Sequence, residues 1–196
     1  MVVVGLAGRA GSGKSAVARR LAERAGVAWV DLDRVAWDVY RPGTPTFAAL
    51  VERFGEPIVG PDGTIDRTRL AAALADAADH HALEEIVHPA VSRALHTLRA
   101  RHERDGVRVL LVEGARLASS PHVDRGAFDA IIWLLVPDAT RRERLRRACR
   151  ESHLGRGSEP EPGAALLYVN AEGPVDDVAE RVWRALEVQG LVTPWP

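Results

Sequence analysis

The residues with the clearest chemical meaning form the stretch Gly-Arg-Ala-Gly-Ser-Gly-Lys-Ser at positions 8–15. Its spacing fits the pattern G-x-x-x-x-G-K-[ST], which builds a P-loop when a buried strand precedes it and a helix follows it. The apolar run 2–6 predicts such a strand, and residues 15–24 predict such a helix. We therefore expect a nucleotide-binding loop made by Gly8, Gly11, Ser12, Gly13, Lys14, Ser15 and Ala16.

The residue types in this loop suit phosphate chemistry. Glycines allow backbone conformations that point successive N–H groups at one anion, and the start of a helix adds unpaired donors. We expect Lys14 to reach the β- and γ-phosphates of ATP as a catalytic residue, and the Ser15 hydroxyl to hold Mg²⁺. Of the 26 basic residues, Lys14 is the only lysine. A compact ammonium is thus kept at one site in a chain that otherwise uses arginine.

Three carboxylates are expected at the same edge of a sheet. A strand over residues 28–30 leads to Asp31 and Asp33, and a strand over 107–113 ends at Glu113. Ligands of open parallel sheets bind beyond the carboxyl ends of the strands, so these side chains are candidates for contacting substrate. Asp33 is either a catalytic base or the N-cap of the helix that follows. Glu113 either holds Mg²⁺ through water or is an ordinary solvated carboxylate.

Arginines concentrate in a helix predicted over residues 140–150. The basic positions there are Arg141, Arg142, Arg144, Arg146, Arg147 and Arg150, with Arg156 beyond. Arginines at the mobile edge of a phosphate site can stabilise charge on a transferring phosphoryl group. One helix cannot aim six side chains at one phosphate, so most should lie on a solvated face and pair with Glu143 and Glu151. We expect Arg147 or Arg150 to be catalytic.

Apolar runs alternate with helical patterns, which predicts an α/β fold with a parallel sheet. The expected strands lie at 2–6, 28–30, 107–113, 130–136 and 166–169, and the last helix at 175–189. We expect one domain of the three-layer P-loop NTPase type, with its core over 1–40 and 106–190. Residues 41–105 predict an inserted helical subdomain that faces the phosphate site. Residues 151–165, rich in glycine, proline and glutamate, predict a short lid.

The predicted insertion contains sequence patterns for several separate helices. Apolar side chains from Phe47 to Phe54 recur at helical spacing, and Asp66 is a candidate cap of a helix over 67–74. Proline is favoured in the first turn of a helix, so a further helix should begin at the pair His88-Pro89.

Length and composition exclude several classes of protein. A chain of 196 residues, 46% of them hydrophobic, suits one domain with a large core. Its net charge of −1 provides no basic field for nucleic acid. The longest apolar run, 130–136, is too short to span a bilayer, so we expect no membrane. The single Cys149 excludes an internal disulfide and fits a reducing compartment. We expect a cytoplasmic monomer or weak homo-oligomer.

Five segments, in order, resemble the dephospho-coenzyme A kinase family. They are Gly5–Ser15, Val30–Ala36, the turn Arg41–Pro45, the stretch Asp62–Arg67, and Ile86–Pro89 with Arg93 following. They cover about residues 1–95 with spacing near that of the family. A P-loop alone occurs in many families, whereas this ordered set is much more specific.

The resemblance implies ATP-dependent phosphorylation of the ribose 3′-hydroxyl of dephospho-coenzyme A, the last step to coenzyme A. It implies that the residue matching Asp33 accepts the hydroxyl proton, and that the insertion, with His88 and Arg93, holds the acceptor. It also implies a lid that closes over ATP. The family's asparagine before the last helix is matched by Asn170, a candidate for the ATP site.

The chain departs from the family pattern in three places. Ala7 and Arg9 stand where threonine and glycine are usual, residues 113–117 replace a P-L-L-x-E segment, and the lid is cut to 151–165. Two other functions therefore stay open. One is a kinase for another nucleoside-like or small hydroxyl acceptor, and the other is a nucleotide-binding regulator without turnover. A base at Asp33 argues against the regulator, and the short lid argues for it.

Overall fold

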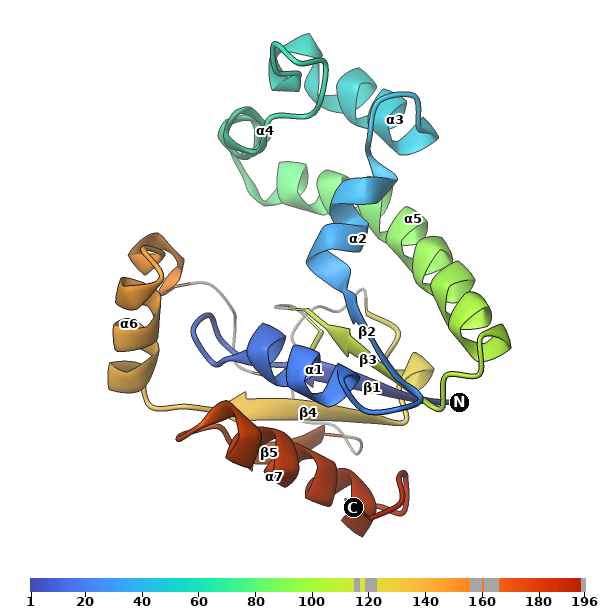
Figure 1. Ribbon diagram of the computed structural model, residues 1–196. Coiled ribbons are helices and arrows are strands. Elements are labelled where there is room, and N and C mark those ends of the chain that lie inside the picture. The colour runs from blue at the N-terminus through green and yellow to red at the C-terminus, as the bar shows by residue number, and fades with distance from the viewer. Residues whose placement is uncertain (115–116, 119–122, 156–159, 161–165, 195–196) are drawn as a thin grey trace. The chain divides into compact units, whose positions relative to one another are not determined.

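The computed structural model describes residues 1–114, 117–118, 123–155, 160 and 166–194 (Figure 1). The chain forms two compact units. We call the first, Met1–Asp31 with Arg101–Pro196, the P-loop unit, and the second, Leu32–Ala100, the helical unit.

Five parallel strands form the centre of the P-loop unit, in the order β2-β3-β1-β4-β5. Their bounds are Val2–Ala7 for β1, Val27–Asp31 for β2, Val109–Glu113 for β3, Ala130–Leu135 for β4 and Leu166–Asn170 for β5. Every residue of β3 is buried, as expected for a strand covered on both faces, and such strands read as continuous apolar runs. The predicted five-stranded parallel sheet is confirmed, with strand bounds close to those expected.

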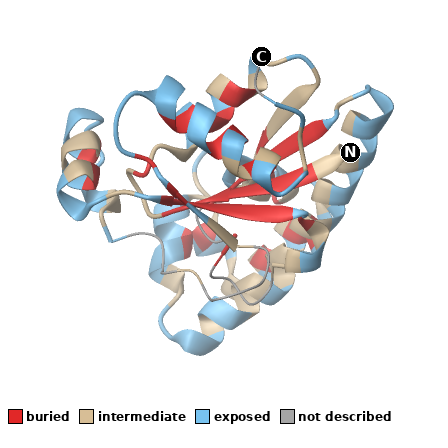
Figure 2. Cartoon of the chain, turned by 90° about the horizontal axis from the view of Figure 1, so that it is seen from below, coloured by how far each residue is buried: buried red, intermediate tan, exposed pale blue. Residues whose placement is uncertain are grey.

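Two helices, α1 (Lys14–Ala22) and α7 (Val175–Val188), cover one face of the sheet (Figure 1). Their inner sides pack into one core with the strands, whereas their outer sides are exposed (Figure 2). The opposite face of the sheet also buries apolar side chains. There Gly5 is small enough for Phe128 and Ile131 to approach the backbone of β1 closely. Because both faces are buried, each strand is a continuous apolar run in the sequence, and these runs located the strands well.

The arginine-rich helix is shorter than expected. Helix α6 spans Asp138–Arg147, where 140–150 was predicted. It ends because Cys149 adopts a φ of 51°, a left-handed conformation that a continuing α-helix does not allow. Arg150 therefore lies outside α6 and directly precedes a short 3₁₀ turn, η3 (Glu151–His153).

The helical unit contains α2 (Leu32–Val39), α3 (Pro45–Phe54), η1 (Glu56–Ile58), α4 (Arg67–Ala73) and most of α5 (Ala77–Arg104). Asp66 caps α4 as predicted, because its carboxylate accepts hydrogen bonds from the backbone N–H groups of Thr68 at 2.7 Å and Arg69 at 3.0 Å. The unit has its own small core, made by Tyr40, Leu50, Ile58, Ile65 and Leu70.

Two features of the helical unit differ from the prediction. Helix α5 runs without a break through Pro89, so no helix begins at His88-Pro89. The φ angle of proline suits a helix, but proline removes one backbone hydrogen bond and its ring crowds the carbonyl four residues earlier. Helix-favouring residues on both sides sustain the helix in spite of this cost. The unit also begins at Leu32 rather than at residue 41, because Trp37 and Tyr40 of the first segment join its core.

Across the described part of the chain, no helix combines the length and the apolar character needed to cross a membrane.

Candidate active site

The P-loop connects β1 to α1 through glycines in conformations that other residues rarely adopt. Gly13 has a φ of 94° and is the N-cap of α1. At Gly11, with a φ of 81°, a Cβ atom would lie 2.9 Å from the carbonyl oxygen of Arg141. A side chain at position 11 would therefore require the loop to move away from α6.

Lys14 begins α1, and its ammonium folds back over the loop. Nζ donates to the carbonyl oxygen of Gly8 at 2.7 Å and to that of Arg9 at 3.4 Å. Ser12 and Ala16, which are also in the predicted nucleotide-binding loop, differ in exposure. Ser12 is buried, whereas Ala16 is exposed and its N–H donates to Gly13 in the first turn of the helix. The loop therefore holds the ammonium of Lys14 against its own backbone.

Ser15 and Glu113 meet at the carboxyl edge of the sheet. The Ser15 hydroxyl donates to Oε1 of Glu113 at 2.6 Å, and Glu113 is only 6% exposed. Strand pairing places Asp31, the last residue of β2, directly beside Glu113. The predicted position at this edge is confirmed for Asp31 and Glu113, whereas Asp33 belongs to the helical unit and its place at this edge stays a prediction. The alternative of a solvated Glu113 is wrong. Hydroxyl and carboxylate oxygens are the ligands that Mg²⁺ prefers, so this set fits that ion.

Arg141 is an almost fully buried arginine, 1% exposed, that ties the P-loop to α6. Its Nε donates to the carbonyl oxygen of Ala10 at 2.8 Å, and its Nη2 donates to that of Leu154 at 2.9 Å. Nη1 pairs with the carboxylate of Asp138 in the first turn of the same helix. One buried guanidinium therefore binds acceptors from three segments.

Arg144 lies one helical turn further along the same side of α6. Its guanidinium donates to the carbonyl oxygen of Ser12 at 3.2 Å and to that of Ala171, just after β5, at 3.0 Å. Sequence reasoning missed Arg141 and Arg144 as the arginines that contact the loop. A signal was present, because both share a helix face with Leu145, a buried residue at an apolar position.

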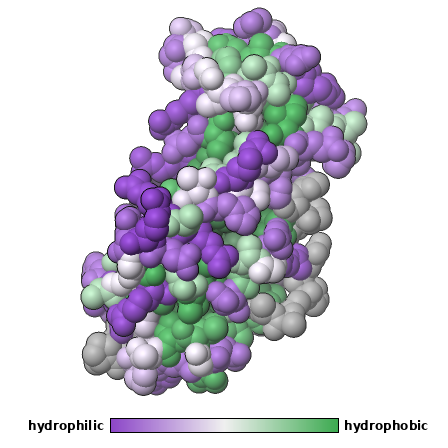
Figure 3. All heavy atoms as spheres, turned by 90° about the vertical axis from the view of Figure 1, so that its right-hand side faces the viewer, coloured by the Kyte–Doolittle hydropathy of each residue, from purple (hydrophilic) through white to green (hydrophobic). Residues whose placement is uncertain are grey.

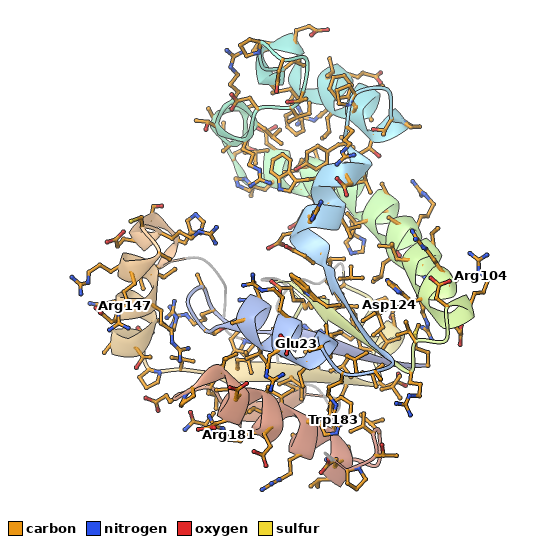
Figure 4. The ribbon with its side chains drawn as sticks, viewed as in Figure 1. Glu23, Arg104, Asp124, Arg147, Arg181 and Trp183 are labelled. Atoms are coloured by element: carbon orange, nitrogen blue, oxygen red, sulfur yellow. The ribbon has the colours of Figure 1, made fainter. Side chains whose placement is uncertain are left out.

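The two arginines that we favoured are on the surface. Arg147 is 76% exposed and donates to Glu143 at 2.8 Å, and Figure 4 shows it on the outer side of α6. Hydrogen bonds from Arg147 and then Arg146 hold the pKa of Glu143 below its usual range. This is the pairing that we expected for the solvated face. Arg150 is also exposed. Their catalytic role stays a prediction, and Arg156 with most of the lid lies outside the described residues.

Asn170 ends β5 and shapes the turn into α7. Its side-chain oxygen accepts from the N–H of Glu172 at 2.9 Å, and its backbone carbonyl accepts from Nε of Arg181 at 3.0 Å. Figure 4 shows Arg181 on α7, the helix that follows this turn. A role for Asn170 in holding ATP stays a prediction.

The remaining candidates belong to the helical unit. Asp33 lies within the first turn of α2 rather than at its N-cap, which contradicts the capping alternative. His88 is half-buried and Arg93 is exposed, both on α5. Their expected roles toward base catalysis and the acceptor stay predictions.

Comparison with known proteins decides the family. The sequence model of the family described as "Dephospho-CoA kinase" matches residues 2–156. The chain belongs to the dephospho-CoA kinase family. Among its curated dephospho-CoA kinase relatives, the protein of Corynebacterium glutamicum is 36% identical over 79% of this chain and 77% of its own length. The protein of Corynebacterium efficiens is also 36% identical, over 95% of this chain and 96% of its own length.

The fold agrees with that of a solved structure. The crystal structure of TT1252 from Thermus thermophilus matches with a TM-score of 0.75 and 26% identity. The match covers 96% of this chain and 97% of that one. The predicted P-loop kinase fold and the family resemblance are both confirmed, with the match extending well beyond the first 95 residues on which the resemblance rested.

The buried arginine provides a test of how this dephospho-CoA kinase fold holds its P-loop. We expect Arg141→Met to lower the free energy of unfolding by at least about 2 kcal/mol, because the hydrogen bonds from one guanidinium to Ala10, Leu154 and Asp138 would be lost together. Urea unfolding followed by circular dichroism measures this. Arg142→Met on the exposed side of α6 is the matched control and should change stability by less than about 0.5 kcal/mol. Equal effects of the two substitutions would contradict the structural role of Arg141.

Proposed function

We propose that this kinase transfers the γ-phosphoryl group of ATP to the ribose 3′-hydroxyl of dephospho-coenzyme A, giving coenzyme A and ADP. The observation that carries the proposal is the P-loop with Lys14 above it and Ser15 bound to Glu113. Family membership supports the acceptor. No feature of the described residues specifically favours another hydroxyl acceptor or a regulator without turnover.

Phosphate binding uses the backbone of the loop and Lys14. The N–H groups around Gly11 and Gly13 and the start of α1 donate to phosphate oxygens. Lys14 exchanges its contacts with Gly8 and Arg9 for the β- and γ-phosphates, because a charged acceptor binds an ammonium more strongly than a carbonyl does. Arg147 or Arg150 and Asn170 complete the nucleotide site in this proposal.

The Ser15–Glu113 pair prepares the site for a divalent cation. Glu113 accepts the hydroxyl hydrogen of Ser15, so the lone pairs of the serine oxygen remain available on its other side. Ser15 would hold Mg²⁺ directly, and Glu113 and Asp31 would hold its water shell. When bound, Mg²⁺ neutralises charge on the β- and γ-phosphates during transfer.

Asp33 acts as the base in this proposal. It accepts the proton of the 3′-hydroxyl as that oxygen bonds to the γ-phosphorus, while the bond from phosphorus to the β–γ bridging oxygen breaks and ADP leaves. His88 and Arg93 bind the acceptor, and residues 151–165 close as a lid that limits transfer to water. A cytoplasmic location and a monomer or weak homo-oligomer stay predictions.

Replacing Lys14 tests the phosphate site. Lys14→Ala should lower kcat by roughly 10²–10³, because a preorganised charge at the transferring phosphoryl group is lost. Formation of ADP and of coenzyme A is measured together in a coupled assay. Arg184→Ala, which removes an exposed i,i+4 pair with Glu180 on α7, is the control for loss of a surface cation. Turnover of Lys14→Ala within threefold of the wild type would contradict the assignment.

Replacing Asp33 separates catalysis from binding. Asp33→Asn keeps the shape and removes the base, so kcat should fall roughly 10²–10⁴-fold. The dissociation constant for ATP, measured by calorimetry, should stay within about threefold. Asp38→Asn, at an exposed position later in α2, provides the matched control. If Asp33→Asn loses stability but retains full activity, the residue is structural and not a base.

Replacing Glu113 tests the cation site. Glu113→Gln can still accept a hydrogen bond from Ser15, but it removes a negative charge beside the hydroxyl. We expect the Mg²⁺ concentration for half-maximal rate to rise about tenfold, with less effect on the rate at saturating Mg²⁺. An unchanged Mg²⁺ requirement, in a variant that unfolds at the wild-type temperature, would exclude Glu113 from the cation site.

A further inference from the structure

A second pocket lies within the P-loop unit, at the opposite end of the strands from the P-loop. Its volume is about 540 Å³, within the range of small-molecule sites. It is lined by Val2, Val27 and Val109 at the amino ends of β1, β2 and β3, by Arg24, Ala25 and Gly26, by Arg108, by Trp183, and by Leu191, Val192 and Thr193. The P-loop and Glu113 lie at the carboxyl ends of these strands, so the pocket is a separate site.

The walls of this pocket are fixed by hydrogen bonds. Trp183, labelled on α7 in Figure 4, donates through Nε1 to the carbonyl oxygen of Thr193 at 2.9 Å and so holds the segment after α7. Arg108 donates through its backbone N–H to Gly26 at 2.8 Å and through its guanidinium to Ala25 at 3.1 Å. The cavity is therefore formed before any ligand arrives, which lowers the cost of binding.

The pocket combines apolar walls with positive charge. The guanidinium of Arg24 lies 4.0 Å from the centre of the Trp183 ring, and Arg108 stands on the same lining. The pKa of Arg24 is lowered, mainly by burial. The charge of Arg108 also lowers this pKa, whereas the charge of Glu187 opposes the shift. Two guanidinium groups thus stand on a described lining that contains no acidic residue.

The lining of the pocket includes apolar side chains that are only partly buried. Figure 3 shows hydrophobic residues gathered at the lower end of the side that carries the N-terminus. Val2, Val27, Leu191 and Val192 are partly buried and pack against the main core, so each keeps some exposed area at the pocket. Apolar walls beside a stacked guanidinium suit a ligand that is apolar at one end and anionic at the other.

We propose that this pocket binds a small amphiphilic anion, a carboxylate or phosphate monoester attached to a short aliphatic or flat apolar body. The apolar body occupies the space between the three valines and the Leu191–Thr193 segment. The anionic group pairs with Arg108 at the rim, and the positive charge of Arg24, whose guanidinium face rests on Trp183, adds to the attraction.

Calorimetric titration of the full-length protein tests the proposal with three probes that share one alkyl chain: octanoate, octyl phosphate and neutral 1-octanol. We expect saturable 1:1 binding of at least one anion, about tenfold or more tighter than that of 1-octanol. Octanoate and octyl phosphate distinguish the two headgroups. Equal affinity for all three probes, or no saturable binding of either anion, would overturn the proposal.

Substitutions in and away from the pocket test where the probe binds. Arg108→Gln should weaken anion binding about tenfold, whereas Arg104→Gln, on the last turn of α5, should leave it within twofold. Ala25→Trp is a second test, because residue 25 is exposed, so a large side chain can block the pocket without disturbing the core. The Lys14→Ala variant should bind the anion like the wild type. Binding that survives both Arg108→Gln and Ala25→Trp, or that is lost with Lys14, would contradict this location.

Discussion

The contact on which the site depends is the one between the P-loop and the buried guanidinium of Arg141. A glycine-rich loop gains freedom to surround phosphate at the cost of having few side chains to hold it, so other elements must fix its backbone. Arg141 does this at Ala10, and Arg144 does it at Ser12. Because Arg141 also binds Leu154, the same side chain links the loop to the segment that begins the predicted lid. Burying this charge is tolerable because its donors meet a carboxylate and two carbonyls.

The parallel sheet provides the second requirement, which is to bring distant residues to one edge. Strands β1, β2 and β3 run in the same direction and in register, so their ends place Ser15, Asp31 and Glu113 together although they are far apart in sequence. The opposite edge collects the amino ends of the same strands, and there the chain leaves a fixed apolar pocket with two arginines. Helix α1 reaches from the P-loop at its start to the Arg24 segment just after its end, so one rigid element borders both sites.

The sequence predicted the sheet, the P-loop, the cap at Asp66 and the shared edge, because each depends on local pattern or on the direction of parallel strands. It failed at Pro89, where a local rule was outweighed, and at the arginines, where the outcome depends on packing between distant segments. Pro89 sits inside α5 because the helix on both sides outweighs the lost hydrogen bond and the crowding by the proline ring. Arg147 looked like Arg141 in sequence, yet one pairs with Glu143 at the surface and the other is buried under the loop. The helix face that Arg141 shares with Leu145 was the one sequence signal that separates these two arginines, and the acceptors at Ala10 and Leu154 are visible only in three dimensions.

The division between lysine and arginine in this chain follows from the same geometry. Arg141 works as a fork, since its planar guanidinium donates in three directions at once, to Ala10, to Leu154 and to Asp138. Lys14 has a different task. Its single nitrogen binds two carbonyls of the loop, and in the proposed reaction it exchanges them for phosphate oxygens. A flexible stem with a compact head can make that exchange, whereas a planar fork would have to reorient as a whole. The one lysine among 26 basic residues thus stands at the position where the proposed reaction requires a cation to change partners.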